Sequence, residues 1–255
     1  MPAPPPAFYP VNLLDGAALG MTPDGAVSGK GPDRLIDRDL GLECEDGGVS
    51  GARVWMADRG VGAAPDAAAA WILAGSNLAG VAFTLDTSDD GSTWTPRATM
   101  TPAANTPVRA ALAPFPVPRY VRWTATDPPT PVRLTEVVLA PALTFRWKPA
   151  AGSLTEPQVL NVNLVNSVSG RGWAVQRGPR RWSSTFTMTN APNVDRIQML
   201  TLLDDLADTA KPFFVLTVTG ELRWVRLLPP ITAAGVTLSP SGEWNLPVSL
   251  VEELP

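Results

Sequence analysis

The fold is decided by the stretch VAFTLDTSDDGSTW, residues 81–94. Its first half alternates large apolar residues with small or polar ones, which is the period of a strand buried on one face. Its second half contains Asp89-Asp90-Gly91-Ser92, a tight-turn signal. Glycine tolerates a positive φ, and aspartate hydrogen-bonds its own backbone. We therefore expect a strand that turns back on itself at residues 89–92.

Similar alternation recurs on both sides of this hairpin. Residues 119–124 and 132–139 read as further strands of the same half, and residue 141 is a proline. Beyond it, new alternating runs begin at residues 143–147, 159–165, 182–189, 213–219, 222–228 and 244–251. The 28 prolines and 21 glycines break the chain into short pieces. Breakers between β-branched and aromatic runs predict many short strands, so the chain should be mainly β.

One segment has helical spacing. Pro192 suits a first helical turn, Asp195 lies near the positive end of the helix dipole, and Pro212 stops the pattern. We expect a helix around residues 192–208. Its apolar stripe should pack on a sheet, and we predict that it consists of Val194, Ile197, Leu200, Leu203 and Leu206.

The first half of the chain resembles a known family. The series SNLAGVAFTLDTSDDGSTW, RYVRWTA and VRLTEVVLA, together with the early NLLDGA and LIDRDLGLE, is similar to galactose-binding-like domains of the discoidin type. This resemblance implies a jelly-roll β-sandwich over residues 11–142. The proline-rich residues 1–10 before it should form an extended arm, because proline fixes φ and lacks the amide donor.

The second half, residues 143–255, resembles another family. Its RRWSSTFTMTNA, VDRIQMLTLLDDL, KPFFVL and GEWNLPVSLVEE segments are similar to distal or minor tail proteins of long-tailed bacteriophages. The resemblance implies a β-domain, sandwich or barrel, that carries one helix.

This resemblance also implies a function, a structural role in the tail tip or baseplate. The chain would form a ring of its own copies that joins the tail tube to the tip, with the tube and hub as partners and a host-surface glycan as a further contact. It would be assembled in the host cytoplasm and carried in the virion. The alternative is a stand-alone carbohydrate-binding module, and a third hypothesis is a glycan hydrolase.

Several chemistries are disfavoured by composition. The chain has no histidine and a single cysteine, Cys44, which excludes an internal disulfide and a zinc site of the usual kind. We expect Cys44 to be a buried, unreactive thiol. The net charge of −4 weighs against nucleic acid as a partner. No apolar stretch is long enough to span a bilayer, so membrane insertion is not expected. We predict no enzyme, no cofactor and no catalytic residue.

Acidic pairs are the remaining candidates for acid–base or metal chemistry. We interpret Asp89-Asp90 as a turn, Asp204-Asp205 as a solvated helix face and Glu252-Glu253 as a polar tail. A calcium site of Asp86, Asp89 and Asp90 is the alternative for the first pair, although the spacing of a calcium-binding loop is missing. We predict no metal site.

The densest basic and aromatic cluster is our candidate interface. It consists of Arg171, Trp173, Arg177, Arg180 and Arg181. Arginine and tryptophan are enriched in protein interfaces, because they combine large contact area with directed donors. The alternative is a solvated loop beside a core Trp182. Five of the nine tryptophans lie in or beside expected strands and should be core residues: Trp94, Trp123, Trp147, Trp224 and Trp244.

Overall fold

The computed structural model describes residues 7–22, 26–47, 51–126, 128, 131–144, 158–159, 162–166, 172–176, 181–206, 211–217, 219–228, 237–238, 242 and 244–253. These residues are mainly β-strand and contain one α-helix. The chain divides into two compact units. Phe8–Leu143 makes up most of one, and Thr144–Leu254 makes up most of the other. None of the described helices is long and apolar enough to cross a membrane.

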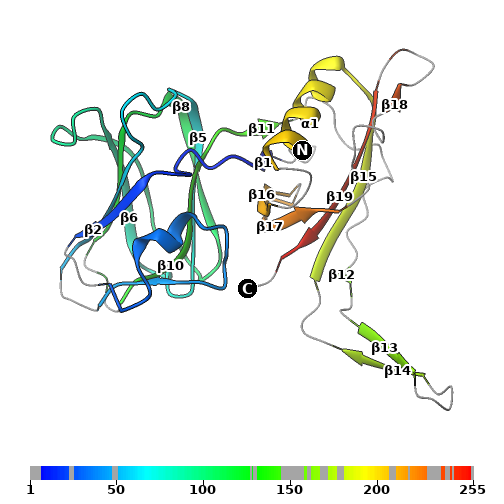
Figure 1. Ribbon diagram of the computed structural model, residues 1–255, viewed down its shortest axis with the longest axis horizontal. Helices are drawn as coiled ribbons and strands as arrows, with labels where there is room; N and C mark the ends of the chain where they lie inside the picture. Colours follow the sequence, from blue (N-terminus) through cyan, green and yellow to red (C-terminus); the bar gives the residue numbers. More distant parts are fainter. Residues whose placement is uncertain are drawn as a thin grey trace. The chain divides into compact units, whose positions relative to one another are not determined.

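The first unit is a β-sandwich of two antiparallel sheets (Figure 1). One sheet has the order β2-β4-β9-β6-β7, which are Ala18–Thr22, Arg53–Asp58, Tyr120–Thr126, Ala82–Ser88 and Thr95–Met100. The other has the order β3-β10-β5-β8, which are Cys44–Glu45, Arg133–Ala140, Ala67–Gly75 and Val108–Pro116. A short 3₁₀ helix, η1, spans Pro32–Ile36. The β-sandwich that the resemblance to galactose-binding-like domains implied is confirmed.

Large side chains from both sheets fill the space between them. Trp55 of β4 lies opposite Trp123 of β9. Leu85 of β6 lies opposite Trp123 on its other side. All three are completely buried. Trp71 and Leu139, paired across β5 and β10, belong to the same core from the other sheet. Cross-strand pairs of this kind, packed face to face, are the main stabilising units of a sandwich.

The chain before the first sandwich strand contains a short strand and an asparagine that anchors it to the sandwich. We expected residues 1–10 to form an extended arm. Residues 1–6 lie outside the described part of the chain, and Ala7–Tyr9 form the buried strand β1, which pairs outside the two sandwich sheets. These three residues contain no proline, so they retain the amide donors that a strand needs. The Asn12 side chain donates to the carbonyl of Val137 at 2.8 Å and accepts from Leu139 N–H at 3.1 Å. Asn12 therefore fixes the chain after β1 onto strand β10.

The second unit contains a main antiparallel sheet and one helix. Its strands include β15, Arg181–Ala191, and β19, Trp244–Glu252, which pair along most of their length. The sheet continues from β19 through β17, Leu222–Leu227, to β16, Phe213–Leu216. The short strands β12, Gln158–Val159, and β18, Thr237–Leu238, pair with β15 and β19. Strands β13, Val162–Asn166, and β14, Gly172–Gln176, form a separate two-stranded sheet. The short β11 is Leu143–Thr144.

The helix forms where the sequence predicts it, but its buried side differs. Helix α1 spans Asn193–Asp205. Val194 and Ile197 of the predicted stripe are exposed, and Ile197 retains 52% of its accessible surface. Leu203 and Leu206 of the stripe are buried as predicted, and Leu200 is half-buried. The other buried residues are Asp195, Met199 and Leu202. Our prediction of the stripe was therefore wrong for its first turn. Apolar residues occur at helical spacing on two sides of this helix, and packing selected the side that contains Met199.

Candidate binding surface

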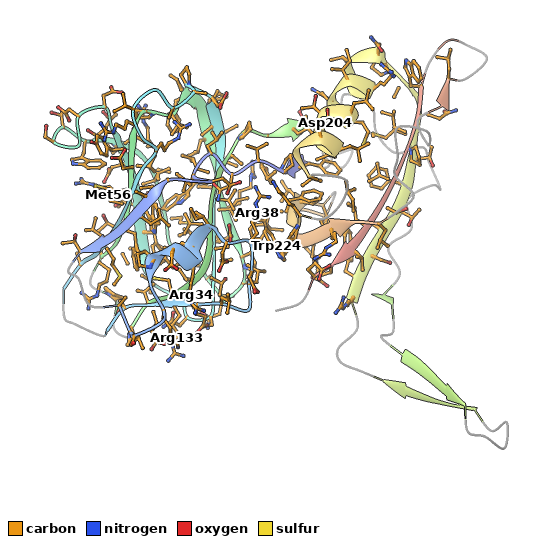
Figure 2. The ribbon with its side chains drawn as sticks, in the orientation of Figure 1. Arg34, Arg38, Met56, Arg133, Asp204 and Trp224 are labelled. Carbon is orange, nitrogen blue, oxygen red and sulfur yellow. The ribbon has the colours of Figure 1, made fainter. Side chains whose placement is uncertain are left out.

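The outward side of the five-stranded sheet carries a row of arginines and aromatic rings. Alternate residues of a strand point to opposite faces. Trp123 points into the core, so its neighbour Arg122 faces outward. Met56 and Asp86, which lie beside Arg122 in register, share that side. Figure 2 labels Met56, which is 39% exposed. We call this surface the arginine–aromatic face; it consists of Met56, Asp58, Asp86, Trp94, Arg119, Tyr120 and Arg122.

Arg122 is held in place by two neighbours. Its guanidinium lies over the Trp94 ring, with 4.2 Å between the guanidinium carbon and the ring centroid. Its Nε donates to a carboxylate oxygen of Asp86 at 3.0 Å. About a third of the Arg122 side chain stays accessible, and Trp94 is only half-buried. The ring and the carboxylate fix the orientation of the arginine, while part of its side chain remains accessible to solvent.

A second group repeats this chemistry beside the first. Arg119 donates from Nε and Nη2 to the two oxygens of Asp58, both at 2.7 Å, in a bidentate pair. Its guanidinium carbon lies 4.6 Å from the centroid of the Tyr120 ring. Tyr120 and Arg122 are two residues apart on β9 and therefore face the same side. The two groups together form one continuous surface.

Charge in the second group is fixed over the neutral pH range. The Arg119 side chain and the Gly60 backbone N–H both donate to Asp58, and they lower the pKa of its carboxyl to about 2. The same hydrogen bond raises the pKa of Arg119. Asp58 is thus an anion at any neutral pH. A carboxylate with so low a pKa is a poor proton donor at neutral pH.

The turn at residues 88–93 positions Trp94. Asp90 accepts from the backbone N–H groups of Ser92 and Thr93, both at 2.8 Å, and from the Ser88 hydroxyl at 2.9 Å. These hydrogen bonds lower the pKa of Asp90. Gly91 has φ 74°, the conformation that the turn prediction requires. Asp89-Asp90-Gly91-Ser92 is therefore confirmed as a tight turn.

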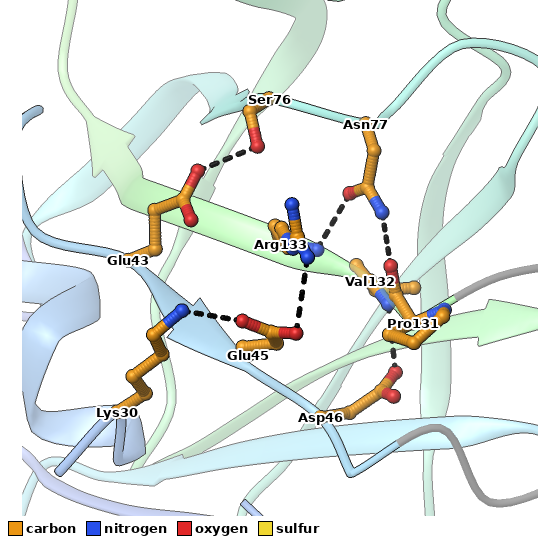
Figure 3. Close-up of polar contacts among 9 residues, drawn as sticks. All are labelled: Lys30, Glu43, Glu45, Asp46, Ser76, Asn77, Pro131, Val132 and Arg133. Atoms are coloured by element: carbon orange, nitrogen blue, oxygen red, sulfur yellow. Dashed lines mark hydrogen bonds and ion pairs between the residues drawn. The ribbon is translucent and has the colours of Figure 1, made fainter. Parts of the chain in front are cut away.

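A second polar cluster lies at one end of the sandwich, where Figure 2 labels Arg133, and Figure 3 shows its contacts. Glu45 accepts from Lys30 Nζ at 2.5 Å and from Arg133 Nη2 at 3.3 Å. Ser76 donates its hydroxyl to Glu43 at 2.5 Å. These contacts link the segment before β3, the β5–β6 connection and the start of β10. Each of the two carboxylates is engaged with a neighbour from another part of the chain.

The inner part of this cluster is structural. Asp46 accepts from Val132 N–H at 2.9 Å and forms a buried ion pair with Arg53 at 3.2 Å. Asn77 accepts from Arg133 N–H at 2.6 Å (Figure 3). None of the nine residues drawn in Figure 3 is aromatic. Its contacts join segments that are distant in sequence, so we interpret the cluster as one that stabilises the sandwich fold.

The candidate interface from the sequence lies mostly outside the described residues. Arg171, Arg177 and Arg180 belong to that part, and of Trp173 only the backbone position in β14 is described. Arg181 begins β15 opposite Val159 and is partly buried. The structure therefore leaves this cluster as a prediction.

The tryptophan expectations have mixed outcomes. Trp123 and Trp224 are buried as predicted. Trp94 and Trp244 are only half-buried, and each carries an arginine on its ring, Arg122 and Arg196 respectively. Those two predictions of core positions were wrong, because a strand pattern does not show which ring ends a hairpin or meets an arginine. Trp147 lies outside the described residues.

Three of the candidate acidic residues, Asp86, Asp90 and Glu252, contact other groups of the protein. Asp86 pairs with Arg122, whereas Asp90 binds its own turn, so the two do not share one site. Within the described ranges, no group of three or more His, Cys, Asp or Glu is placed to hold a metal. We expected Glu252 to belong to a polar tail, and that prediction was wrong. Glu252 ends strand β19, pairs with Arg223 at 2.9 Å and accepts from Trp182 N–H at 3.0 Å. Asp204 is exposed on helix α1.

Cys44 is completely buried at the start of β3. Burial raises the pKa of its thiol to about 11, although a hydrogen bond with Trp55 acts in the opposite direction. The thiol is therefore protonated at neutral pH, and only the thiolate is an effective nucleophile. This agrees with the predicted unreactive, buried cysteine.

Comparisons with known proteins give matches among solved structures. No protein-family model and no curated protein matches the chain. Chitosan-binding module 2 of a Paenibacillus sp. IK-5 chitosanase/glucanase, solved with chitotriose, is 17% identical. The match covers 51% of this chain and all of that one, with a TM-score of 0.44. A CBM32 module produced by Clostridium perfringens is 15% identical over 51% of this chain and 98% of that one, with a TM-score of 0.42. A Ruminococcus gnavus GH29 fucosidase is 11% identical over 53% of this chain and 28% of its own, with a TM-score of 0.45.

Proposed function

We propose that the β-sandwich is a non-catalytic module that binds carbohydrate through the arginine–aromatic face. The observation that carries this proposal is the stack of Arg122 on Trp94, anchored by Asp86, on a sheet face that retains exposed surface. The Asp58–Arg119–Tyr120 group extends the same face. The module's role is recognition, and its chemistry is hydrogen bonding and ring packing.

The chemistry of the face suits a sugar. A pyranose ring has an apolar C–H side that packs on an aromatic ring, and hydroxyls that act as both donors and acceptors. Arg122 and Asp86 supply a donor and an acceptor within one hydrogen-bonded pair. Both groups are already fixed by each other and by Trp94, so little side-chain freedom is lost on binding.

Hydrolysis fits this face poorly. Glycoside hydrolysis needs one carboxyl group that donates a proton and a second that stays ionised. Asp86 and Asp58 are each paired with an arginine, and the pKa of Asp58 is about 2. Asp58 is therefore ionised at neutral pH and cannot act as the proton donor, which supports binding over bond cleavage.

Binding can be tested with a matched pair of arginine variants. Arg122→Ala removes the arginine from the face, whereas Arg133→Ala removes a carboxylate-paired arginine at the end of the sandwich. The full chain is applied to a glycan array that includes chito-oligosaccharides and pectin fragments, and hits are measured by titration calorimetry. We expect Arg122→Ala to weaken binding about tenfold or more, which corresponds to ~1.4 kcal/mol, and Arg133→Ala to leave it unchanged. No binding by the wild type, or equal losses in both variants, would contradict the proposal.

The second unit favours a second candidate function, a subunit of a bacteriophage tail tip. The supporting observation is the order of its elements: strand β15 with Trp182 and Phe186, then helix α1, then strand β16 beginning at Phe213, and finally strand β19 from Trp244 to Glu252. This order follows the motifs that resemble distal and minor tail proteins. The chain would then form a ring of its own copies between tail tube and tip, and present its sandwich to host glycans.

The tail role has a direct test. Tailed particles released by a strain that carries this gene are labelled with antibodies against the purified chain and imaged by negative-stain electron microscopy. Gold at the tail end distal to the capsid is the expected result, with pre-immune serum as the control. Gold along the whole tube, or absence of the chain from particles analysed by mass spectrometry, would count against the tail-tip role.

A further inference from the structure

Strands β13 and β14 form a small sheet of their own among the described strands. Val162–Asn166 pairs antiparallel with Gly172–Gln176 over five residue pairs, with Leu164 opposite Ala174 at the centre. Among the strands that the structure describes, these two pair only with each other. Each strand therefore has one backbone edge without a neighbouring strand in the described part of the chain.

A sheet of two strands needs further pairing or packing to be stable. An isolated two-stranded hairpin is marginally stable in water, and at least three strands or a packed face are needed for lasting stability. Free strand edges also present unpaired N–H and C=O groups that pair readily with another chain. Proteins usually protect such edges with charged residues or proline. The sequences of β13 and β14, VNLVN and GWAVQ, contain neither.

Charge distinguishes the two edges. The sequence has no charged residue from Val159 to Gly170, a range that contains all of β13. Strand β14 is followed directly in sequence by Arg177 and preceded by Arg171. Antiparallel pairing of β14 with its own copy would bring these arginines toward like charges, and like charges directly opposite are destabilising. Pairing of β13 with its own copy meets no such repulsion.

We propose that β13 of one copy pairs antiparallel with β13 of a second copy, about a two-fold axis at Leu164. The product is a four-stranded sheet in the order β14-β13-β13-β14. The contact is isologous, so one uncharged edge supplies both sides of the interface. Asn163 then lies opposite Val165 of the other copy, and Val162 opposite Asn166. The partner at this surface is thus a second copy of this chain. This contact goes beyond the functions proposed above, because it requires only a second copy of the chain.

Charge exchange at Leu164 tests the pairing. Analytical ultracentrifugation of the full-length chain is expected to show a species of twice the 27.0 kDa monomer mass. Leu164→Lys alone and Leu164→Glu alone should each sediment as monomers, because the two-fold axis sets like charges against each other. An equimolar mixture of the two variants should regain the dimer, because opposite charges then meet. The dimer should recover in the mixture only if residue 164 of one copy contacts residue 164 of the other.

Val61→Lys is the matched control, since Val61 is 89% exposed in the sandwich and the substitution adds the same charge. It should leave the dimer intact. Unchanged near-ultraviolet circular dichroism shows that the Leu164 variants remain folded. A wild-type monomer at all concentrations, or a mixture that stays monomeric, overturns the proposal. If no dimer forms but gold still labels the tail tip, the β13 contact is refuted and the tail-tip role is retained. If a dimer forms but the tail is not labelled, the β13 contact is supported and only the tail-tip role is refuted.

Discussion

The buried carboxyl group of Glu136 should make the sandwich less stable as pH rises. Glu136 lies on β10 and is completely buried. One of its oxygens accepts from Arg38 N–H at 3.0 Å, and the other has no hydrogen-bond partner among the described residues. Burial raises the pKa of Glu136 well above its usual range. The Arg38 contacts lower this pKa, and the charges of Asp37 and Asp15 raise it further.

The sign and size of the effect follow from proton linkage. In the unfolded chain this group has its ordinary pKa, 4.5. Between that value and the raised folded pKa, the folded state holds a proton that the unfolded state has released. Stability is therefore fully present below the unfolded pKa and declines as pH rises toward the folded pKa, by up to about 1.4 kcal/mol per pH unit for one proton. Glu136→Gln keeps an oxygen acceptor for Arg38 N–H and has no charge to bury.

Denaturant unfolding at several pH values between about pH 5 and about pH 7 measures this difference. The stability of Glu136→Gln relative to the wild type should increase with pH at up to about 1.4 kcal/mol per unit. Glu45→Gln is the control, and its stability should keep a constant difference from the wild type over this pH range. The pKa of Glu45 is lowered, chiefly by the hydrogen bond from Lys30, so its contribution is present above the unfolded pKa and is lost on acidification. Parallel pH profiles for Glu136→Gln and the wild type would refute the reasoning.

Three further predictions concern the sandwich core. Gly75→Ala should destabilise the sandwich by about 1–3 kcal/mol in denaturant titrations, because its β-carbon would overlap the carbonyl oxygen of Arg133. Gly20→Ala, with open space at the same atom, should change stability by less than about 0.5 kcal/mol. Trp123→Ala should cost about 3–5 kcal/mol of unfolding free energy, because the ring is completely buried. The Cys44 thiol, with a pKa of about 11, should react with a thiol reagent at neutral pH only as fast as the sandwich opens.

Much of the fold could be predicted from local sequence. Period-two alternation located β6, β9 and β10, and the aspartate–glycine turn after β6 followed from the conformations that Gly91 and Asp90 allow. The helix followed from its spacing and the flanking prolines. These features depend on residues within a few positions of one another, so the sequence contains their full physical cause.

The candidate surface depended on contacts that local sequence does not contain. Alternation shows that Arg122 and Trp123 lie on opposite faces of β9, but only strand register places Asp86 beside Arg122 and brings Trp94 under its guanidinium. Sequence alone suggested a core position for Trp94.

Helix α1 illustrates the same limit. Apolar residues lie at helical spacing both on the side of Ile197 and on the side of Met199. Either side satisfies a helical pattern, and only the sheet that receives the helix decides that Met199 is buried and Ile197 exposed. The sequence by itself determined the strands with clear alternation, the turn after β6 and the helix, because those choices are local. The tertiary structure decided which faces are covered and which side chains meet, because burial is a property of the whole packed unit.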